Sequence, residues 1–309
     1  MHDPAHQHHD PAHPHAPARE GEQRRLTIAL TVTAVAMVAE ALGGWVSNSL
    51  ALLSDAGHLM ADVGAIALSL FALRVGARPA DAKRTYGYHR LEILAALVNG
   101  AVLFGIAAGI ALEGFQRLRH PEPVQVRTMA LLACLGIVLN AAGMWITHTG
   151  ERGSMNLRST FLHLAGDLLN SVGVLVSALL IAWTGNLMVD PVVSFLIAGT
   201  IVWSAIRLCR EALHVLLEGT PGHIRIREVS EAIASVPGVS AVHDLHVWTI
   251  TSGLVALSCH IVVTCPGPDC RSHDEILIDA KAVLRDRFAI EHTTIQFESE
   301  DYRHEEVVH

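Results

Sequence analysis

Charged residues are scarce in this chain of 309 residues: Asp, Glu, Lys and Arg together make up 17% of it, whereas hydrophobic residues make up 51%. Since an average soluble domain carries about 25% charged residues, this composition indicates a protein that lies largely within a lipid bilayer. Aromatic residues are few, at 5%, and the 12 prolines exclude a proline-rich low-complexity chain. Five scattered cysteines exclude a disulfide-stapled secreted miniprotein.

Positively charged residues are fewer than negatively charged ones: the chain has 22 Lys and Arg and 30 Asp and Glu, which gives a net charge of -8. This balance gives no electrostatic reason to bind nucleic acid. Histidine, by contrast, is abundant, with 20 residues. The imidazole ligates metals and changes its charge near about pH 6.5, so metal binding is the first functional hypothesis.

The amino-terminal 25 residues are polar and rich in Pro and His, with no apolar core of a signal peptide. We expect a disordered cytoplasmic tail. Its histidines either bind soft or borderline cations weakly or are only solvated; they are His2, His6, His8, His9, His13 and His15.

Six apolar segments follow within residues 26–218, each close to the roughly 20 residues that a helix needs to cross a bilayer. An even number of spans places both termini on one side. Lys and Arg precede the first span and crowd the second connection, whereas the first and fifth connections have none. Despite three arginines in or beside the third connection, the positive-inside rule predicts cytoplasmic termini. The expected spans are 26–46, 50–75, 91–112, 129–147, 157–183 and 192–208.

Residues 219–303 have the pattern of a small cytoplasmic α+β domain, followed by a flexible C-terminus at 304–309. Amphipathic helices are predicted at 224–235 and 274–288, and β-branched strands at 239–251, 254–263 and 293–298. The order αββαβ places helices on one face of a three-stranded sheet.

Two of the predicted spans carry the same motif, H-x-x-x-D, as His58 with Asp62 and His163 with Asp167. Residues four apart share a helix face, so two such helices together supply two nitrogens and two oxygens, a tetrahedral set suited to Zn²⁺. Helix rise places both pairs near the midplane of the bilayer. The alternative is that each His–Asp pair makes only a polar contact between helices. An ionisable group at the middle of a membrane span costs at least about 2.5–3.5 kcal/mol, which weighs against two such pairs without a function.

Other polar residues in the spans either line an ion route and orient the ligands or make ordinary hydrogen bonds between helices. These residues are Glu40, Asp55, Asn99, Asn140 and Asn170.

The block at 47–58, the paired H-x-x-x-D motif, and His243-Asp244-Leu245-His246-Val247-Trp248 ahead of residues 294–298 resemble the cation diffusion facilitator family, in particular its zinc-type members. The resemblance implies a homodimeric metal/H⁺ antiporter of the bacterial inner membrane, with a ferredoxin-like cytoplasmic domain at the dimer interface. His58, Asp62, His163 and Asp167 match the family's transport site. Because members with Asp at the first position accept more metals, His58 favours Zn²⁺, with Co²⁺ and Cd²⁺ as alternatives.

The resemblance also implies a regulatory zinc site in the cytoplasmic domain, at His243, His260, His292 and Glu298, with His246 and His273 as weaker candidates. Some relatives hold an additional, exposed metal ion in the loop after the second span. In this chain only Asp81 and His89 could serve as its ligands, so a stable site is not expected there. Arg90 and Glu218 match a hinge charge pair. Two further functions stay open: an intramembrane zinc metalloenzyme, although four ligands leave no position for water, and a non-transporting metal sensor. Cys265 and Cys270 are read as reduced thiols, without an assigned role.

Overall fold

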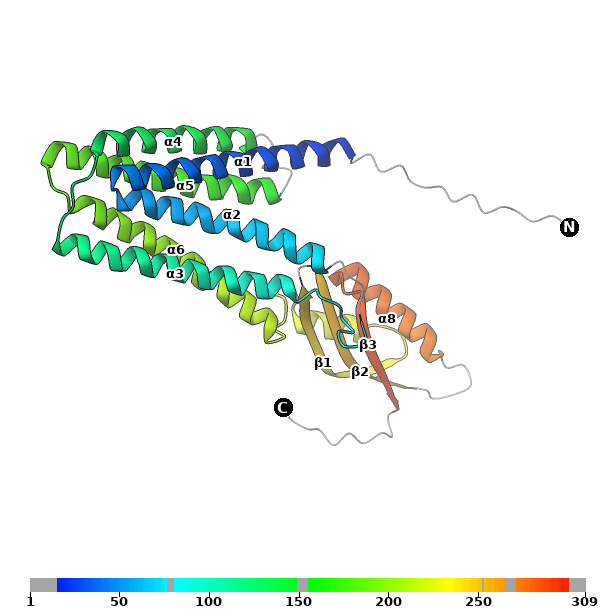
Figure 1. Ribbon diagram of the computed structural model, residues 1–309. Helices are drawn as coiled ribbons and strands as arrows, with labels where there is room; N and C mark the ends of the chain where they lie inside the picture. Colours follow the sequence, from blue (N-terminus) through cyan, green and yellow to red (C-terminus); the bar gives the residue numbers. More distant parts are fainter. Residues whose placement is uncertain (1–15, 77–80, 149–154, 252, 265–270, 300–309) are drawn as a thin grey trace. The chain divides into compact units, whose positions relative to one another are not determined.

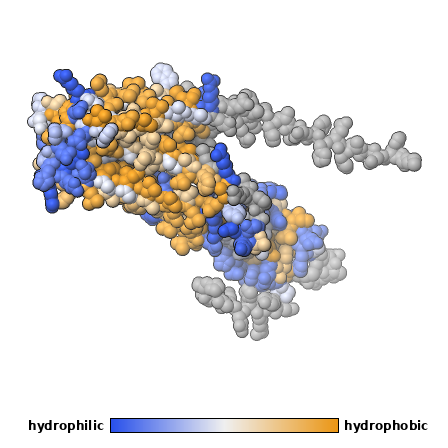
Figure 2. All heavy atoms as spheres, viewed as in Figure 1, coloured by the Kyte–Doolittle hydropathy of each residue, from blue (hydrophilic) through white to orange (hydrophobic). Residues whose placement is uncertain are grey.

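A computed structural model describes residues 16–76, 81–148, 155–251, 253–264 and 271–299 (Figure 1). Within these ranges, six helices are long and apolar enough to cross a membrane, which confirms the six predicted spans. Large apolar side chains cover their outer surface (Figure 2), such as Trp145, which is 81% exposed. Such a surface suits lipid rather than water. The helices are α1 (Ala16–Ser47), α2 (Leu50–Gly76), α3 (Leu91–Arg119), α4 (Val126–His148), α5 (Met155–Thr184) and α6 (Val189–Leu216).

Several helices are longer than the apolar segments that predicted them. Helix α1 begins at Ala16 because the polar residues ahead of its span are mostly good helix formers such as Ala, Glu, Gln and Arg. Helix α3 continues to Arg119 and ends just before Pro121, which cannot donate a backbone hydrogen bond. An apolar run therefore marks the part of a helix that faces lipid, and not the whole helix.

Glycines let the helices of the first compact unit, residues 1–66 and 101–204, approach one another. Helix α4 packs between α1 and α5. A Cβ atom on Gly136 would lie 2.6 Å from Glu40 Oε1, and one on Gly143 would lie 3.0 Å from Leu164 Cδ1. Small residues at such crossings are how transmembrane helices pack closely. As a result, Glu40 of α1 and Ser171 of α5 both lie beside Gly136 of α4.

The N-terminus of α2 is fixed by a carboxylate from α6. The buried Asp190 accepts hydrogen bonds from Ser49 Oγ at 2.6 Å, from the Leu50 backbone N–H at 2.7 Å and from the Ala51 N–H at 3.3 Å. The first N–H groups of a helix have no partner within it and favour negative charge. Asp190 thus sets the position of the helix that carries His58 and Asp62.

The carboxy-terminal domain has the predicted order αββαβ, which confirms the expected fold class (Figure 1). Strands β1 and β2 pair antiparallel, β2 and β3 pair parallel, and the sheet order is β1-β2-β3. Its elements are α7 (Ile226–Ala234), β1 (Val239–Thr251), β2 (Leu254–Val263), α8 (His273–Phe288) and β3 (His292–Ser299).

One face of this sheet is covered by both helices. Ile233 of α7 and Leu284 of α8 are buried in one core with Cys259 and Ile261 of β2. Helix α8 begins with a capping box, in which Ser272 and Glu275 bond each other's backbone N–H groups. Since successive strand residues point to opposite faces, the residues between the core positions of β2 lie on the face that the helices leave uncovered.

Candidate metal centres

The four transmembrane residues with the H-x-x-x-D spacing come together in the structure. His58 Nε2 lies 3.8 Å from Asp62 Oδ2 and 3.6 Å from Asp167 Oδ1. His163 Nε2 lies 3.4 Å from Asp62 Oδ2 and 3.6 Å from Asp167 Oδ2. Each imidazole nitrogen therefore has two carboxylates within 3.8 Å, and the two rings are tilted by 58° with centroids 6.0 Å apart.

These four separations are close to those around a small tetrahedral ion. One atom each of His58, Asp62 and Asp167 lies within 4.8 Å of the others, whereas His163 is not in this group. Zn²⁺ with His nitrogen and carboxylate oxygen at about 2.0–2.1 Å needs ligand atoms about 3.3 Å apart, slightly less than the 3.4–3.8 Å observed. Ca²⁺ requires six to eight oxygen ligands at about 2.3–2.6 Å. The donor set of two nitrogens and two carboxylates therefore suits a borderline transition metal better than a hard cation.

The ligands differ in their access to solvent. The side chain of Asp167 is 1% exposed and that of His58 12%, whereas Asp62 is 25% and His163 40% exposed. Within the part of the chain that the structure describes, both carboxylate oxygens of Asp167 and Nδ1 of His58 are buried without a hydrogen-bond partner. Buried polar atoms normally have a partner, and a metal ion would supply one to Asp167.

Four of the five other polar residues expected in the spans also lie close together. Asn140 and Asp55 both contact Ser171, and Asn170 and Glu40 are neighbours of Asp55. The fifth residue, Asn99, is buried on α3.

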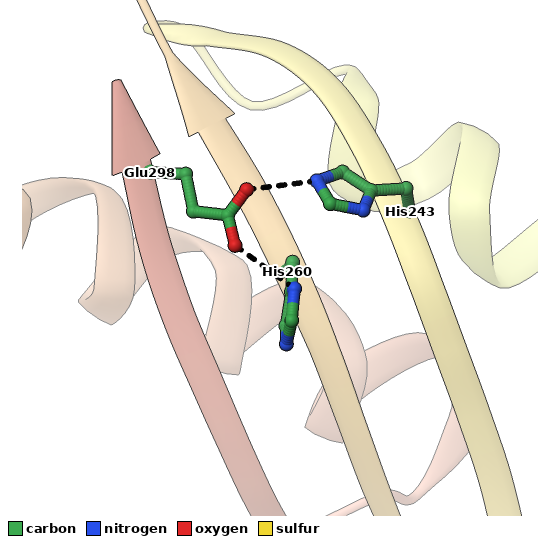
Figure 3. A group of neighbouring side chains, drawn as sticks. All are labelled: His243, His260 and Glu298. Atoms are coloured by element: carbon green, nitrogen blue, oxygen red, sulfur yellow. Dashed lines mark hydrogen bonds and ion pairs between the residues drawn. The ribbon is translucent and has the colours of Figure 1, made fainter. Parts of the chain in front are cut away.

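In the carboxy-terminal domain, Glu298 bridges two histidines on the uncovered face of the sheet (Figure 3). Its Oε2 lies 3.0 Å from His243 Nε2 and its Oε1 lies 2.9 Å from His260 Nδ1. His243 and His260 are cross-strand partners on β1 and β2. One atom of each of the three side chains lies within 4.8 Å of the others, close enough to hold one metal ion.

A β-bulge brings a further acid to this cluster. His243 pairs with His260 and His246 pairs with Ser258, so β1 has one extra residue over this interval. Asp244 lies in the bulge with a positive φ of 48°, and its carboxylate is 2.9 Å from His246 Nε2 and 3.6 Å from His260 Nε2. The hydrogen bond from His246, followed by the charges of the nearby histidines, lowers the pKa of Asp244. Sequence reasoning missed Asp244, for which His-Asp-Leu-His was the available signal.

The other residues proposed for this domain do not join the cluster. His292 is exposed at the start of β3 and contacts the ring of Tyr86, with centroids 5.4 Å apart. It lies six residues before Glu298, which is about 20 Å along a strand. His273 stacks on Phe297, with centroids 5.0 Å apart.

The expected loop ligand Asp81 is engaged by its own turn. Its carboxylate accepts hydrogen bonds from the backbone N–H groups of Lys83 and Arg84 and from the Tyr88 hydroxyl. The Lys83 bond, followed by the Tyr88 bond, lowers the pKa of Asp81. Within the described ranges, no group of three potential ligands includes Asp81 or His89.

The expected charge pair is present: Arg90 Nη2 lies 3.0 Å from Glu218 Oε1, with both side chains exposed. Cys259 is buried in the domain core, and burial raises the pKa of its thiol to about 11, so it stays protonated at neutral pH. Cys265, Cys270 and the histidines of the amino-terminal tail lie outside the described residues.

Comparison with known proteins gives two family matches that together span most of the chain. Residues 26–217 match the cation efflux transmembrane domain, and residues 221–300 match the cytoplasmic domain of cation efflux proteins.

Several similar proteins come from bacteria. The metal cation efflux system protein CzcD of Cupriavidus metallidurans is 41% identical, over 90% of this chain and 87% of that protein. The zinc transporter ZitB of Escherichia coli is 38% identical, over 94% and 91%. The cadmium, cobalt and zinc/H(+)-K(+) antiporter of Bacillus subtilis is 36% identical, over 94% and 93%. A solved metal-bound C-terminal domain of CzcD is 40% identical, over 24% of this chain and 99% of that structure, with a TM-score of 0.22.

The six apolar helices and these matches define an integral membrane transporter of divalent metal cations, and not an enzyme. The chain belongs to the cation diffusion facilitator family. Both the fold class and the family expected from the sequence are thereby confirmed.

Proposed function

We propose that this chain exports Zn²⁺ from the cytoplasm in exchange for protons, by alternating access to the site formed by His58, Asp62, His163 and Asp167. The observation that carries the proposal is the convergence of two imidazole nitrogens and two carboxylates at separations of 3.4–3.8 Å within a helical unit. Co²⁺ and Cd²⁺ are expected as competing substrates, since nitrogen and carboxylate ligands bind them too. Relatives are named for zinc, cobalt and cadmium, which supports this range.

Proton exchange follows from the chemistry of the ligands. An imidazole must be neutral and a carboxylate ionised to bind a metal, so metal binding releases protons and protonation releases metal. His58 and His163 supply the imidazoles of the site, and imidazole is the side chain that most often exchanges protons near neutral pH in proteins. An inward flow of protons therefore drives the metal out. The B. subtilis relative is named as an antiporter, which supports the exchange.

We further propose a homodimer with both termini in the cytoplasm, in which residues 26–218 form the transport domain and residues 219–303 form the metal-binding dimerisation domain. The tail at 1–25 and the segment at 304–309 flank them. The matched cytoplasmic domain of cation efflux proteins and the distribution of Lys and Arg between connections support this orientation.

The cluster of His243, His260 and Glu298 is proposed as a regulatory zinc site. Zinc bound there would favour one dimer arrangement and raise transport when cytoplasmic zinc is plentiful. His292 is too far along β3 to serve the same ion within one protomer. The effect is allosteric only if two states of the dimer differ in their affinity for zinc.

Zinc flux into proteoliposomes under imposed pH gradients of both signs tests the proposal. Wild type is compared with Asp167→Ala and with Asp286→Ala, a matched exposed acid on α8. We expect flux that follows the proton gradient in wild type and Asp286→Ala and is lost in Asp167→Ala. Equal flux in Asp167→Ala would reject the site, flux indifferent to the gradient would reject proton exchange, and zinc binding without flux would favour a sensor.

A further inference from the structure

A second polar cluster lies inside the helical unit and contains none of the proposed metal ligands. Glu40 of α1, Asp55 of α2, Asn140 of α4 and Ser171 of α5 are all at most 1% exposed. Acidic side chains within a membrane span are costly and mark functional positions. Four helices contribute to this cluster, so no single helix accounts for it.

The contacts in the cluster leave Glu40 in an unusual position. Asn140 Nδ2 donates to Ser171 Oγ at 3.4 Å, and Ser171 Oγ donates to Asp55 Oδ2 at 3.4 Å. Gly136 leaves room for the Glu40 carboxyl beside this chain, since a Cβ there would lie 2.6 Å from Glu40 Oε1 and 2.9 Å from Ser171 Oγ. Among the residues that the structure describes, no donor reaches either oxygen of Glu40.

The charged groups around Glu40 are acids. The carboxyl of Asp55 from α2 lies within hydrogen-bonding reach, and Asp167 from α5 is the next acid that acts on it. The contact from α4 is Gly136, with the neutral Asn140 nearby. Across the described ranges, no Lys or Arg forms an ion pair with Glu40 or Asp55. Within the described part of the chain, two ionised carboxylates here would therefore have no Lys or Arg to offset their charge.

Two neighbouring carboxyl groups in this setting need a proton between them. An ionised carboxylate only accepts hydrogen bonds, so the contact of Glu40 with Asp55 is a hydrogen bond only when one of them is protonated. Burying a second unpaired charge is far more costly than neutralising it. Asp55 accepts a hydrogen bond from Ser171, which favours its ionised form. The proton therefore belongs on Glu40.

We propose that Glu40 is a proton-carrying site, separate from the metal ligands, which releases its proton when a metal ion binds and regains it when the ion leaves. This inference rests on the proposed proton exchange. A metal ion bound at Asp167 brings positive charge close to the buried carboxylates. This charge offsets their negative charge in place of the proton on Glu40. The O–H bond of Glu40 then breaks, its electron pair stays on the carboxylate, and the proton passes to water.

Infrared difference spectroscopy of the full-length protein in lipid tests whether Glu40 holds a proton, without reference to transport. Wild type without metal should show a carbonyl band of a protonated carboxylic acid that shifts in D₂O and decreases when Zn²⁺ is added. Glu40→Gln keeps the shape of the side chain and can still donate to Asp55, so we expect it to fold and to lack this band. An unchanged band in folded Glu40→Gln would overturn the proposal.

A second variant covers the case in which Glu40→Gln does not fold. Asp55→Asn replaces the acceptor of the Glu40 proton by an amide, so the acid band should persist at a shifted frequency. An unshifted band would overturn the assignment, because the protonated group would then not be bonded to Asp55. A site filled by Na⁺ or K⁺ instead of a proton would show no acid band in wild type and would also overturn it.

Coupled flux measurements separate this proposal from the one on which it rests. Proton and zinc movements are recorded together for wild type, Glu40→Gln and Glu211→Gln, an exposed control on α6. We expect Glu40→Gln to move fewer protons per zinc and Glu211→Gln to match wild type. Wild-type ratios in Glu40→Gln would overturn the role of Glu40, whereas a wild type that moves zinc without protons would reject the exchange itself and leave the infrared result standing.

Discussion

The two proposed ligand clusters of this transporter are built in opposite ways. In the transmembrane cluster the imidazole nitrogens and carboxylate oxygens lie 3.4–3.8 Å apart, beyond hydrogen-bonding distance, and the helices hold them in place. In the carboxy-terminal domain, Glu298 is bonded to His243 at 3.0 Å and to His260 at 2.9 Å. A metal entering the membrane cluster fills an arrangement already open to it, whereas a metal entering the domain must displace hydrogen bonds. The membrane cluster is therefore suited to repeated binding and release of metal. The domain cluster is suited to binding metal only above a threshold concentration.

The largest effect expected from this difference is in the membrane. Asp62→Asn removes one of two carboxylates that flank both imidazoles, and zinc flux into vesicles should fall more than about 100-fold, since even the outer partners of metal ligands contribute about 10–100-fold to affinity. Asp274→Asn, at the solvent-exposed start of α8, serves as the control. A loss below tenfold would mean that Asp62 is not a ligand.

A smaller effect is expected in the domain. Glu298→Gln removes the carboxylate shared by His243 and His260, so zinc affinity of the domain should weaken by about 10–100-fold, while flux at saturating zinc persists. Equilibrium dialysis of full-length protein carrying Asp62→Asn isolates the domain sites. If Glu298→Gln alone abolished zinc flux at saturating zinc, as Asp62→Asn is expected to do, the two clusters would not differ in role.

The open membrane cluster also depends on how firmly its helices are held. Asp190→Asn weakens the three hydrogen bonds at the N-terminus of α2 and should reduce the free energy of unfolding by about 1–2 kcal/mol, the usual range for a lost helix cap. Chemical unfolding in detergent measures this loss. Ser49→Ala removes one of these three bonds and also the bond from the Leu52 N–H to Ser49 Oγ, so it is no measure of the carboxylate alone. A loss below about 0.5 kcal/mol in Asp190→Asn would contradict the role given to the carboxylate.

The smallest effect belongs to a charge pair that lies in neither cluster. Arg90 and Glu218 are both exposed, and exposed pairs contribute about 0.2–1 kcal/mol, less at high salt. Glu218→Gln should therefore leave unfolding nearly unchanged, within about 1 kcal/mol of wild type, and the difference should shrink as salt rises. A salt-independent loss above about 2 kcal/mol would mean that the pair is buried in the working protein.

The sequence predicted the membrane cluster better than the domain cluster because helix geometry is local. His58 with Asp62 and His163 with Asp167 share a helix face by spacing alone, and the structure brings both pairs together. The extensions of α1 and α3 were not predicted, because apolar runs mark only the lipid-facing part of a helix. Likewise, Glu40 could be recognised as a polar residue in a span, but its neighbour Asp55 belongs to another helix and depends on packing.

In the domain, grouping depends on strand register, which the sequence did not specify. His292 and Glu298 were both expected as zinc ligands of the domain from the family resemblance, yet six residues of extended chain separate them by about 20 Å. Asp244 was missed because its approach to His246 and His260 requires a bulge. Nothing in the strand-like pattern of β1 marks where an extra residue enters.

That bulge limits how this segment can change in length. Residues an odd number apart on a regular strand point to opposite faces, so without the extra residue either His243 or His246 would enter the apolar core under the sheet. Point substitutions at Asp244 change the polar face alone. Deleting or adding a single residue between the two histidines would exchange the faces of every residue on one side of it, and we expect relatives to vary here in side chain but not in length.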